Sequence, residues 1–323
     1  MSEIRRVGVL TSGGDAPGMN AAIRAVVRDC VRNGVTPVGV RRGYNGLIHA
    51  DLAEMEAKSV NGITSKGGTI LYTARCEDFL QHEGVELGVR TCKYMGLDAL
   101  ICIGGDGTFM GAYELSKAGI TVVGIPGTID NDIGCCHYTI GFDTAANTAI
   151  NAIDKLSDTM QSHERVSVVE IMGRRAGHLA VYVGLAVGAT SILIPEIQYD
   201  FNKDIIEKIR EGRYTGKHHF LIIVAEGIGK CDELAARVHD ETGLEARVSI
   251  LGYIQRGGSP SVRDRVMASR MGYMAVEEIV AGRGNSIICY RDSRLIATPI
   301  AEAMAMTKKL DPYMYQVAQN IAL

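Results

Sequence analysis

The sequence predicts an α/β fold built on mainly parallel sheets that are covered by helices on both faces. Short apolar runs alternate with segments of helical periodicity, which is the pattern of parallel strands buried on both faces. The chain has 323 residues, of which 46% are apolar and 22% charged, so it can form about two domains of roughly 100–200 residues each. A second alternation begins near residue 143.

The first half of the chain is predicted to hold three buried strands and an amphipathic helix. The strands are the apolar runs at 7–12, 99–105 and 121–128. In the segment 21–34, apolar side chains fall on one helical face, and Arg24 and Arg28 fall on the other. Gly34 is expected to end that helix.

The second half is predicted to hold four more strands, with helices between them. The strands are the apolar runs at 166–171, 191–195, 220–227 and 247–254. A helix is expected over 145–156, capped by Asp143 or Thr144. The segment 179–195 carries no charge and approaches the minimum length of a membrane span, about 17 residues. Because two glycines interrupt it, we interpret it as a buried helix followed by a buried strand.

The composition excludes several classes of partner. The net charge is −3, with both signs spread along the chain, and no basic block indicates nucleic acid. No long apolar stretch precedes the first glycine turn, so we expect no signal peptide. The eight cysteines form no C-x-x-C pairs, and we expect reduced thiols in the core, with disulfides or zinc as alternatives. A cytoplasmic protein without a membrane partner is therefore expected.

Four Gly-rich turns follow predicted strands, at 11–20, 104–108, 126–132 and 172–177. Open parallel sheets bind ligands at the carboxyl ends of their strands. In the first turn, Gly13 and Gly14 leave backbone N–H groups uncovered and the next helix adds its positive end, so an anion fits there. A plain tight turn is the alternative. Neither the Walker sequence G-x-x-x-x-G-K-[ST] nor the fingerprint G-x-G-x-x-G occurs in the chain.

A carboxylate, Asp106, lies in the second turn, where a bare negative charge would repel polyphosphate. A Mg²⁺ ion between the two reverses this interaction, and Mg²⁺ is usually held by one or two carboxylates together with substrate phosphates and waters. The flanking glycines, Gly105 and Gly107, let a polyphosphate approach the backbone. We therefore predict that Asp106 is a magnesium ligand; the alternative is an aspartate that caps the following helix.

Two carboxylates, Asp130 and Asp132, lie two residues apart in the third turn. If the segment is extended, both side chains point the same way. Carboxylates in unequal environments can divide their work, one as a base and one on the metal side. A phosphoryl acceptor needs its hydroxyl proton removed or oriented, which an aspartate can do. The alternative for "IDND" is a structural Asx turn.

Arginines are the expected cations for phosphate, because their planar guanidinium groups match phosphate oxygens. Glycines flank Arg174 in "MGRRAG" and Arg256 in "IQRGGSP", which favours these two as site residues. The other candidates end apolar or turn segments: Arg75, Arg165 and Arg247.

Taken together, these motifs make the chain resemble the ATP-dependent 6-phosphofructokinases of the bacterial type. The resemblance covers essentially the whole chain. It is carried by "GVLTSGGDAPGMNAAIR", "GGTILYTAR", "IGGDGT", "PGTIDND", "SHERVSVVEIMGR", "VAEG", "LGYIQRGGSP", "DR" and "ASRMG". It implies two Rossmann-like lobes: an ATP- and Mg²⁺-binding lobe at 1–141 and 255–305, and a fructose 6-phosphate-binding lobe at 142–254 and 306–323.

The implied reaction is the glycolytic transfer of the γ-phosphoryl group of Mg-ATP to the 1-hydroxyl of fructose 6-phosphate. In the family pattern, Asp130 is the base, Thr128 contacts the transferring phosphate and Arg174 stabilises the transition state. The implied ATP contacts are Gly14, Arg75, Cys76, Gly105, Asp106, Gly107 and Thr108. The implied sugar-phosphate contacts are Thr128, Ile129, Asp130, Met172, Gly173, Arg174, Glu226, Tyr253 and Arg256, with Arg165 and Arg247 from a neighbouring subunit of a homotetramer.

Several positions bear on rival functions. Tyr253 replaces the histidine usual in the family, and tyrosine cannot become a cation near neutral pH. Pyrophosphate-dependent relatives typically carry an acidic residue and a lysine where this chain has Gly107 and Gly127, which favours ATP. A non-catalytic sugar-phosphate sensor is expected to have lost Asp106 or Asp130, and both are present. A dinucleotide oxidoreductase is disfavoured by the missing fingerprint.

The effector site implied by the resemblance is incomplete. Arg24, Arg28 and Lys217 remain as candidate cations, and the two arginines are one helical turn apart, so they can hold one anion; an exposed basic stripe is the alternative. Other charged residues expected in the family are replaced by Ser157, Thr190 and Thr215. We therefore expect weak or absent activation by ADP and weak inhibition by phosphoenolpyruvate.

Overall fold

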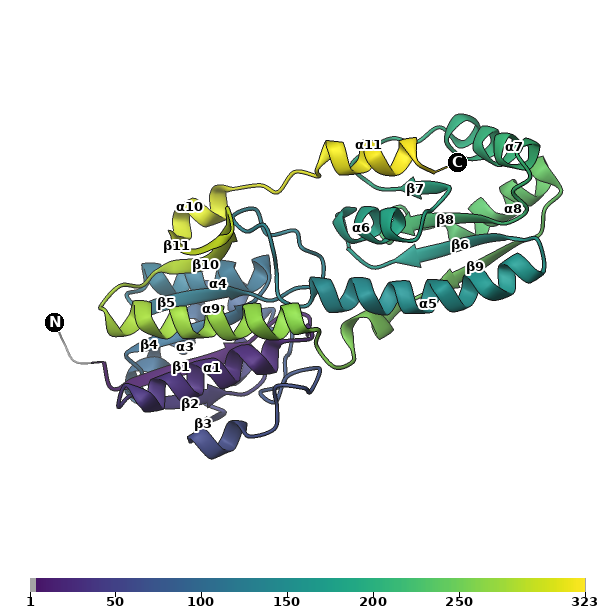
Figure 1. Cartoon of the computed structure of the whole chain (residues 1–323). Coiled ribbons are helices and arrows are strands. Elements are labelled where there is room, and N and C mark those ends of the chain that lie inside the picture. The colour runs from purple at the N-terminus through teal and green to yellow at the C-terminus, as the bar shows by residue number, and fades with distance from the viewer. Residues whose placement is uncertain (1–3, 323) are drawn as a thin grey trace. The chain divides into compact units, whose positions relative to one another are not determined.

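The computed structural model describes residues 4–322, except for the side chain of Leu80, and divides the chain into two compact units (Figure 1). The first unit comprises Met1–Ile129, Ile133–Thr144 and Arg256–Lys308. The second comprises Asp130–Asp132, Ala145–Gln255 and Lys309–Leu323. The boundaries resemble those of the expected lobes, but residues 130–132 belong to the second unit.

The first unit is built on a seven-stranded sheet. Its strand order is β11-β10-β5-β4-β1-β2-β3, parallel except for the edge strands β3 and β11. The strands are β1 (Arg6–Thr11), β2 (Thr36–Val40), β3 (Leu52–Glu54), β4 (Ala99–Gly104), β5 (Thr121–Pro126), β10 (Ser286–Arg291) and β11 (Arg294–Pro299). The four central strands have almost entirely buried side chains, so the three strands predicted in this half are confirmed.

Helices cover both faces of this sheet. α1 (Met19–Arg32) and α9 (Val262–Val280) pack along each other on one face, and α3 (His82–Tyr94) and α4 (Asp106–Lys117) lie on the other (Figure 1). The short helices are α2 (Gly43–Ile48) and α10 (Ile300–Ala305), with 3₁₀ turns η1 (Ala57–Val60) and η2 (Asp78–Leu80). The helix predicted over 21–34 is α1.

The second unit holds a four-stranded, fully parallel sheet in the order β7-β8-β6-β9. The strands are β6 (Val166–Ile171), β7 (Ser191–Leu193), β8 (Phe220–Ala225) and β9 (Ala246–Ile250). The helices are α5 (Phe142–Ser162, whose first three residues belong to the first unit), α6 (His178–Ala186), the π-helical turn η3 (Asn202–Ile206), α7 (Glu207–Tyr214), α8 (Cys231–Thr242), the 3₁₀ turn η4 (Gly252–Arg256) and α11 (Pro312–Asn320).

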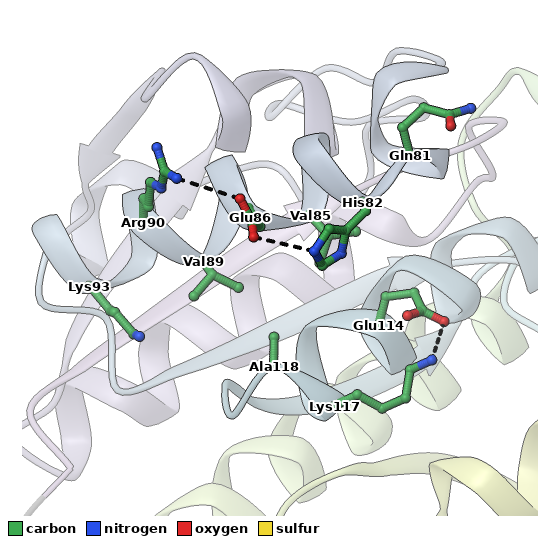
Figure 2. Close-up of a pocket in the computed structure, with 10 residues that line it drawn as sticks. All are labelled: Gln81, His82, Val85, Glu86, Val89, Arg90, Lys93, Glu114, Lys117 and Ala118. Carbon is green, nitrogen blue, oxygen red and sulfur yellow. Dashed lines mark hydrogen bonds and ion pairs between the residues drawn. The ribbon is translucent and has the colours of Figure 1, made fainter.

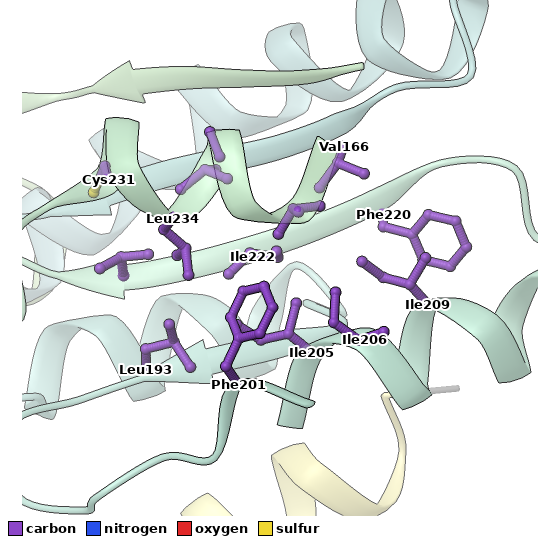
Figure 3. Close-up of a cluster of buried hydrophobic side chains, with 14 residues drawn as sticks. Val166, Leu193, Phe201, Ile205, Ile206, Ile209, Phe220, Ile222, Cys231 and Leu234 are labelled. Carbon is purple, nitrogen blue, oxygen red and sulfur yellow. The ribbon is translucent and has the colours of Figure 1, made fainter. Parts of the chain in front are cut away.

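The core of the second unit lies where η3, α7 and α8 pack on one face of this sheet (Figure 3). Phe220 and Ile222 of β8 meet Ile205 and Ile209 from the helical side, and all four side chains are fully buried. Continuous apolar strands are buried in this way only when both faces of a sheet are covered. The predicted fold class, α/β with mainly parallel sheets between helices, is therefore confirmed.

Two local expectations are wrong. The strand predicted over 247–254 stops at Ile250, because Gly252 takes a left-handed conformation (φ +54°) and the chain turns into η4. The helix expected to begin after a cap at Asp143 or Thr144 begins at Phe142, so both residues lie inside it.

The uncharged segment 179–195 forms most of α6 and all of β7, as predicted. Among residues 4–322, no helix combines the length and apolarity that crossing a membrane requires. The eight cysteines are free thiols, Cys76 half-buried and the others buried.

Candidate active site

The first three Gly-rich turns follow β1, β4 and β5, which are neighbours in the first unit's sheet. Backbone hydrogen bonds join the turns: Ser12 donates to Ile103 (3.1 Å), and Gly127 donates to Gly104 (2.9 Å). The predicted grouping of these turns at one edge of a parallel sheet is thus present, and this is where open α/β sheets bind ligands.

The turn after β1 leads directly into α1. Its backbone is left-handed at Gly13 (φ +82°) and Gly18 (φ +109°), and the helix has no side-chain cap. A Cβ atom at Gly14 would lie 2.3 Å from Nη1 of Arg256, so this guanidinium packs on the Gly14 backbone. The resemblance assigns Gly14 to ATP and Arg256 to the sugar phosphate. In the structure the two are neighbours, which places a cation beside a turn suited to anions.

The turn after β4 fixes the start of α4. Gly104 is required there, since a Cβ would lie 2.2 Å from Oγ1 of Thr108. The Thr108 hydroxyl donates to the Ser12 carbonyl (3.0 Å), and the Tyr44 hydroxyl donates to the Thr108 carbonyl. Tyr44 was not predicted as a site residue. These bonds hold the first and second turns together.

Asp106 is the exposed first residue of α4, and the helix is capped by Gly105 without a side-chain bond. The alternative that Asp106 is the helix cap is therefore wrong. A Cβ at the neighbouring Gly107 would meet nothing within 4 Å. One exposed carboxylate beside open space and a helix N-terminus is the donor set that suits Mg²⁺ bound with phosphates and waters. Among the described residues no group of three or more His, Cys, Asp or Glu side chains could hold a metal alone.

The turn after β5 brings Thr128 against the second turn, because a Cβ at Gly105 would lie 3.8 Å from the Thr128 Cβ. Ile129 is buried. Arg75 is exposed and Cys76 half-buried, two and three residues beyond Thr73, whose hydroxyl donates to the Gly13 carbonyl (2.7 Å). The segment implied to contact ATP therefore runs beside the first turn.

The expectation that Asp130 and Asp132 lie on an extended segment and point the same way is wrong. Asn131 between them is left-handed (φ +50°), which breaks the alternation of an extended chain. Their environments differ, as predicted: the Asp130 residue is 2% exposed, whereas Asp132 is half-buried. Oδ2 of Asp130 lies 3.6 Å from Nε of Arg174, both in the second unit.

The fourth turn, after β6, is held by one carboxylate. Gly173 and Arg174 both donate their backbone N–H to Oε2 of Glu226 (3.2 and 2.9 Å), and Arg174 is left-handed (φ +53°). Met172 is buried beside them. The second unit thus brings together most of the residues implied to bind the sugar, with the Arg174 side chain 55% exposed.

Arg165 and Arg247 share a partner that the sequence analysis missed. Nε of Arg165 lies 2.5 Å from Oε2 of Glu245, and Arg247 pairs with Oε1 of the same carboxylate. The hydrogen bond from Arg165 is the main cause that lowers the pKa of Glu245. One acidic side chain therefore holds both arginines together. Tyr253, also in the second unit, is largely exposed on η4.

The candidate effector residues are separate groups. Arg24 and Arg28 lie one turn apart on α1, and Arg28 donates to the Asn61 side chain (2.9 Å). In the second unit, the Lys217 ammonium donates to the Thr190 hydroxyl and the Ala322 carbonyl (both 3.3 Å). Burial lowers the pKa of Lys217. This lysine is already bonded by oxygens of its own chain.

A cavity of about 570 Å³ lies between α3 and α4, away from the glycine turns (Figure 2). Its charged residues pair with each other: Glu86 lies between His82 and Arg90, and Glu114 pairs with Lys117. The lining residues include none of the predicted site residues. The candidate active site is therefore at the turns rather than in this cavity.

Comparison with known proteins gives a consistent picture. The Phosphofructokinase family profile matches residues 6–279. The chain is 51% identical to the ATP-dependent 6-phosphofructokinase of Clostridium botulinum over 315 residues, 98% of each chain. Phosphofructokinase from Saccharomyces cerevisiae has a TM-score of 0.86 at 32% identity, over 93% of this chain but only 44% of the yeast chain. The pyrophosphate-dependent phosphofructokinase from Marinobacter aquaeolei has a TM-score of 0.87 at 21% identity, over 99% and 91% of the two chains, so the fold alone does not identify a phosphoryl donor.

Proposed function

Because the chain belongs to the phosphofructokinase family, we propose that it is an ATP-dependent 6-phosphofructokinase. It transfers the γ-phosphoryl group of Mg-ATP to the 1-hydroxyl of fructose 6-phosphate and gives fructose 1,6-bisphosphate and ADP. The observation that carries the proposal is the buried Asp130 carboxylate, 3.6 Å from the Arg174 guanidinium. This pairs a proton acceptor with a cation for the transferring group, the two parts that phosphoryl transfer needs from a protein.

The first unit is proposed to bind the nucleotide. Its joined turns offer backbone N–H groups and the N-terminus of α4 to the phosphates. Asp106 would hold Mg²⁺, which when bound neutralises the charge of the phosphates. Thr128 would contact the transferring phosphate. Arg256, beside Gly14, is placed to meet an anion at the first turn.

The second unit is proposed to bind fructose 6-phosphate. Asp130 accepts or orients the proton of the 1-hydroxyl as that oxygen attacks, and Arg174 stabilises the charge that develops on the phosphoryl group. Asp132, half-buried, would act on the metal side. Met172, Gly173 and Glu226 shape the sugar site, with the Glu226 carboxylate holding the backbone from which the Arg174 side chain projects.

Two further parts of the proposal concern assembly. We propose a cytoplasmic homotetramer in which Arg165 and Arg247 complete the site of a neighbouring subunit. Glu245 holds the two guanidinium groups together, and a convergent pair of arginines suits a phosphate group. Sedimentation equilibrium tests the tetramer.

The first prediction concerns the phosphoryl donor. We expect turnover of fructose 6-phosphate with ATP and not with pyrophosphate, because Gly107 leaves open space and adds no negative charge beside Asp106. A coupled assay with each donor measures this, and activity with pyrophosphate alone would contradict it. Gly107→Asp should lower kcat/KM for ATP, whereas Gly119→Asp, at the far end of α4, should not.

The second prediction concerns effectors. Each charge-assisted bond to a phosphate contributes about 1.5–3 kcal/mol, less where solvent screens it. The replacements Ser157 and Thr215 remove two expected cations, and the Lys217 ammonium already has two oxygen partners. We therefore expect ADP to activate weakly or not at all, and phosphoenolpyruvate to inhibit weakly. Fructose 6-phosphate saturation curves with each effector measure this. A sigmoidal curve made hyperbolic by sub-millimolar ADP would show that the remaining cations suffice.

A further inference from the structure

A buried carboxylate to which the proposed function gives no role lies at the start of α9. Asp264 is fully buried (0% exposed), and its backbone N–H is bonded by the helix cap, Ser261 (3.2 Å). Its side chain accepts bonds from a segment 120 to 126 residues earlier. Oδ1 accepts from the Tyr138 hydroxyl and the Gly141 N–H (2.7 Å), and Oδ2 accepts from the N–H (2.8 Å) and hydroxyl of Thr144.

This arrangement defines a single geometry. Burial is the main cause that raises the pKa of Asp264, and the bonds from Thr144, Tyr138 and Gly141 oppose it. A buried carboxylate without such donors would be strongly unfavourable. The Thr144 hydroxyl also accepts from the Ser261 N–H (2.9 Å), so its proton is directed to Asp264. Both carboxylate oxygens therefore act as acceptors only.

The segment held by Asp264 supports the turn after β5. The Ile140 N–H donates to the Pro126 carbonyl (3.0 Å), and Ile140 forms a β-bridge with Gly127. The Thr139 hydroxyl donates to the Thr128 carbonyl (2.6 Å). Because these residues directly precede Gly141, the position of Thr128 depends on a segment that Asp264 fixes.

The same carboxylate lies close under the turn after β1. A Cβ at Gly18 would lie 2.6 Å from Cγ2 of Ile140 and 3.5 Å from Cβ of Asp264. A Cβ at Gly141 would lie 2.7 Å from that of Ala16. Two of the three turns of the first unit therefore rest on the group of bonds around Asp264.

We propose that Asp264 is a positioning residue for phosphoryl transfer, which sets Thr128 and the first glycine turn at the distance that the reaction requires. The inference rests on the proposed function. Misplacing a reacting group by about 1 Å can lower a rate by about 10²-fold, so a buried contact behind the turn is sufficient to affect the chemical step without touching substrate.

Asp264→Asn tests the inference, because the amide keeps the shape but replaces one acceptor with a donor. Two of the four donors then face an NH₂ group. We expect kcat to fall by about 10- to 100-fold, while KM for ATP and fructose 6-phosphate changes less than about threefold. An unchanged kcat would overturn the inference. If the wild-type chain itself does not phosphorylate fructose 6-phosphate, the proposed function fails instead.

The matched control is Glu278→Gln on the same helix. Glu278 is buried and forms two hydrogen bonds with Arg283 (2.8 and 2.7 Å), so its loss also removes a bonded carboxylate from α9. We expect a lower melting temperature and an unchanged kcat per folded protein. Equal losses of kcat in both variants at matched stability would show that Asp264 is only structural.

A double variant tests whether the effect passes through Thr128. In a Thr128→Ala background, adding Asp264→Asn should lower kcat less than about threefold, since the group that it positions is gone. A full further loss would overturn this route. Should Asp264→Asn not fold, Tyr138→Phe removes one donor and keeps the ring under Arg263 (4.5 Å); a three- to tenfold lower kcat is expected, on the order of one lost bond to a charged group, and wild-type kcat would contradict the inference.

Discussion

Replacing Asp130 by serine is expected to lower kcat with fructose 6-phosphate by about 10²–10⁴-fold, the contribution of a positioned general base. Serine cannot accept the hydroxyl proton, and it leaves the Arg174 guanidinium without the carboxylate 3.6 Å away. Binding of ATP should change little, because Asp130 belongs to the second unit and the nucleotide turns to the first. Steady-state kinetics and an ATP-binding titration measure the two effects.

The control for this variant is Asp158→Ser, which removes an exposed carboxylate from α5 in the same unit. It should retain wild-type kcat and melting temperature. If Asp130→Ser kept more than about a tenth of wild-type kcat, the role of base would be wrong.

Buried strands were predictable from the sequence because their apolar runs have no other stable location. The runs that form β4, β6 and β8 are buried along almost their whole length, and such runs in a chain of alternating periodicity require a parallel sheet between helices. The family resemblance is confirmed by the profile match and by the 51% identical relative.

Left-handed residues explain where the local predictions failed. The run 247–254 is apolar enough for a strand, but Gly252 at φ +54° ends it after Ile250. Asn131 at φ +50° turns Asp132 away from the face of Asp130. Asparagine and glycine tolerate this conformation in many settings, so their presence alone did not show that the chain would turn there.

The missed residues share a different cause. Glu245 and Asp264 act through partners that lie 80 and more than a hundred residues away, Arg165 and the segment 138–144. Glu245 was visible only as one acid among many, and Asp264 only as part of "DR" in the resemblance. Residues that contact ligands follow motifs, whereas residues that hold those motifs depend on tertiary contacts that periodicity does not reveal.

Arg174→Ala is expected to lower kcat by about 10²–10³-fold, the cost of removing one preorganised group that stabilises developing charge. Its backbone is fixed by the Glu226 carboxylate and its side chain is more than half exposed, so it can reach a phosphoryl group without unfolding a core. Alanine keeps a Cβ, so the left-handed backbone at φ +53° is neither relieved nor strained further. The melting temperature should therefore stay within a few degrees of wild type while kcat falls.

The neighbouring residue provides the control, since Arg175 is also exposed and Arg175→Ala removes the same charge one position along. That variant should keep wild-type kcat. Because Arg174 also contacts Asp130, the Asp130→Ser and Arg174→Ala effects should combine to less than their product, as for residues that act as one unit. Equal activity of the two arginine variants would show that only the net charge of this turn matters. Fully multiplicative losses would separate Asp130 and Arg174 into independent roles.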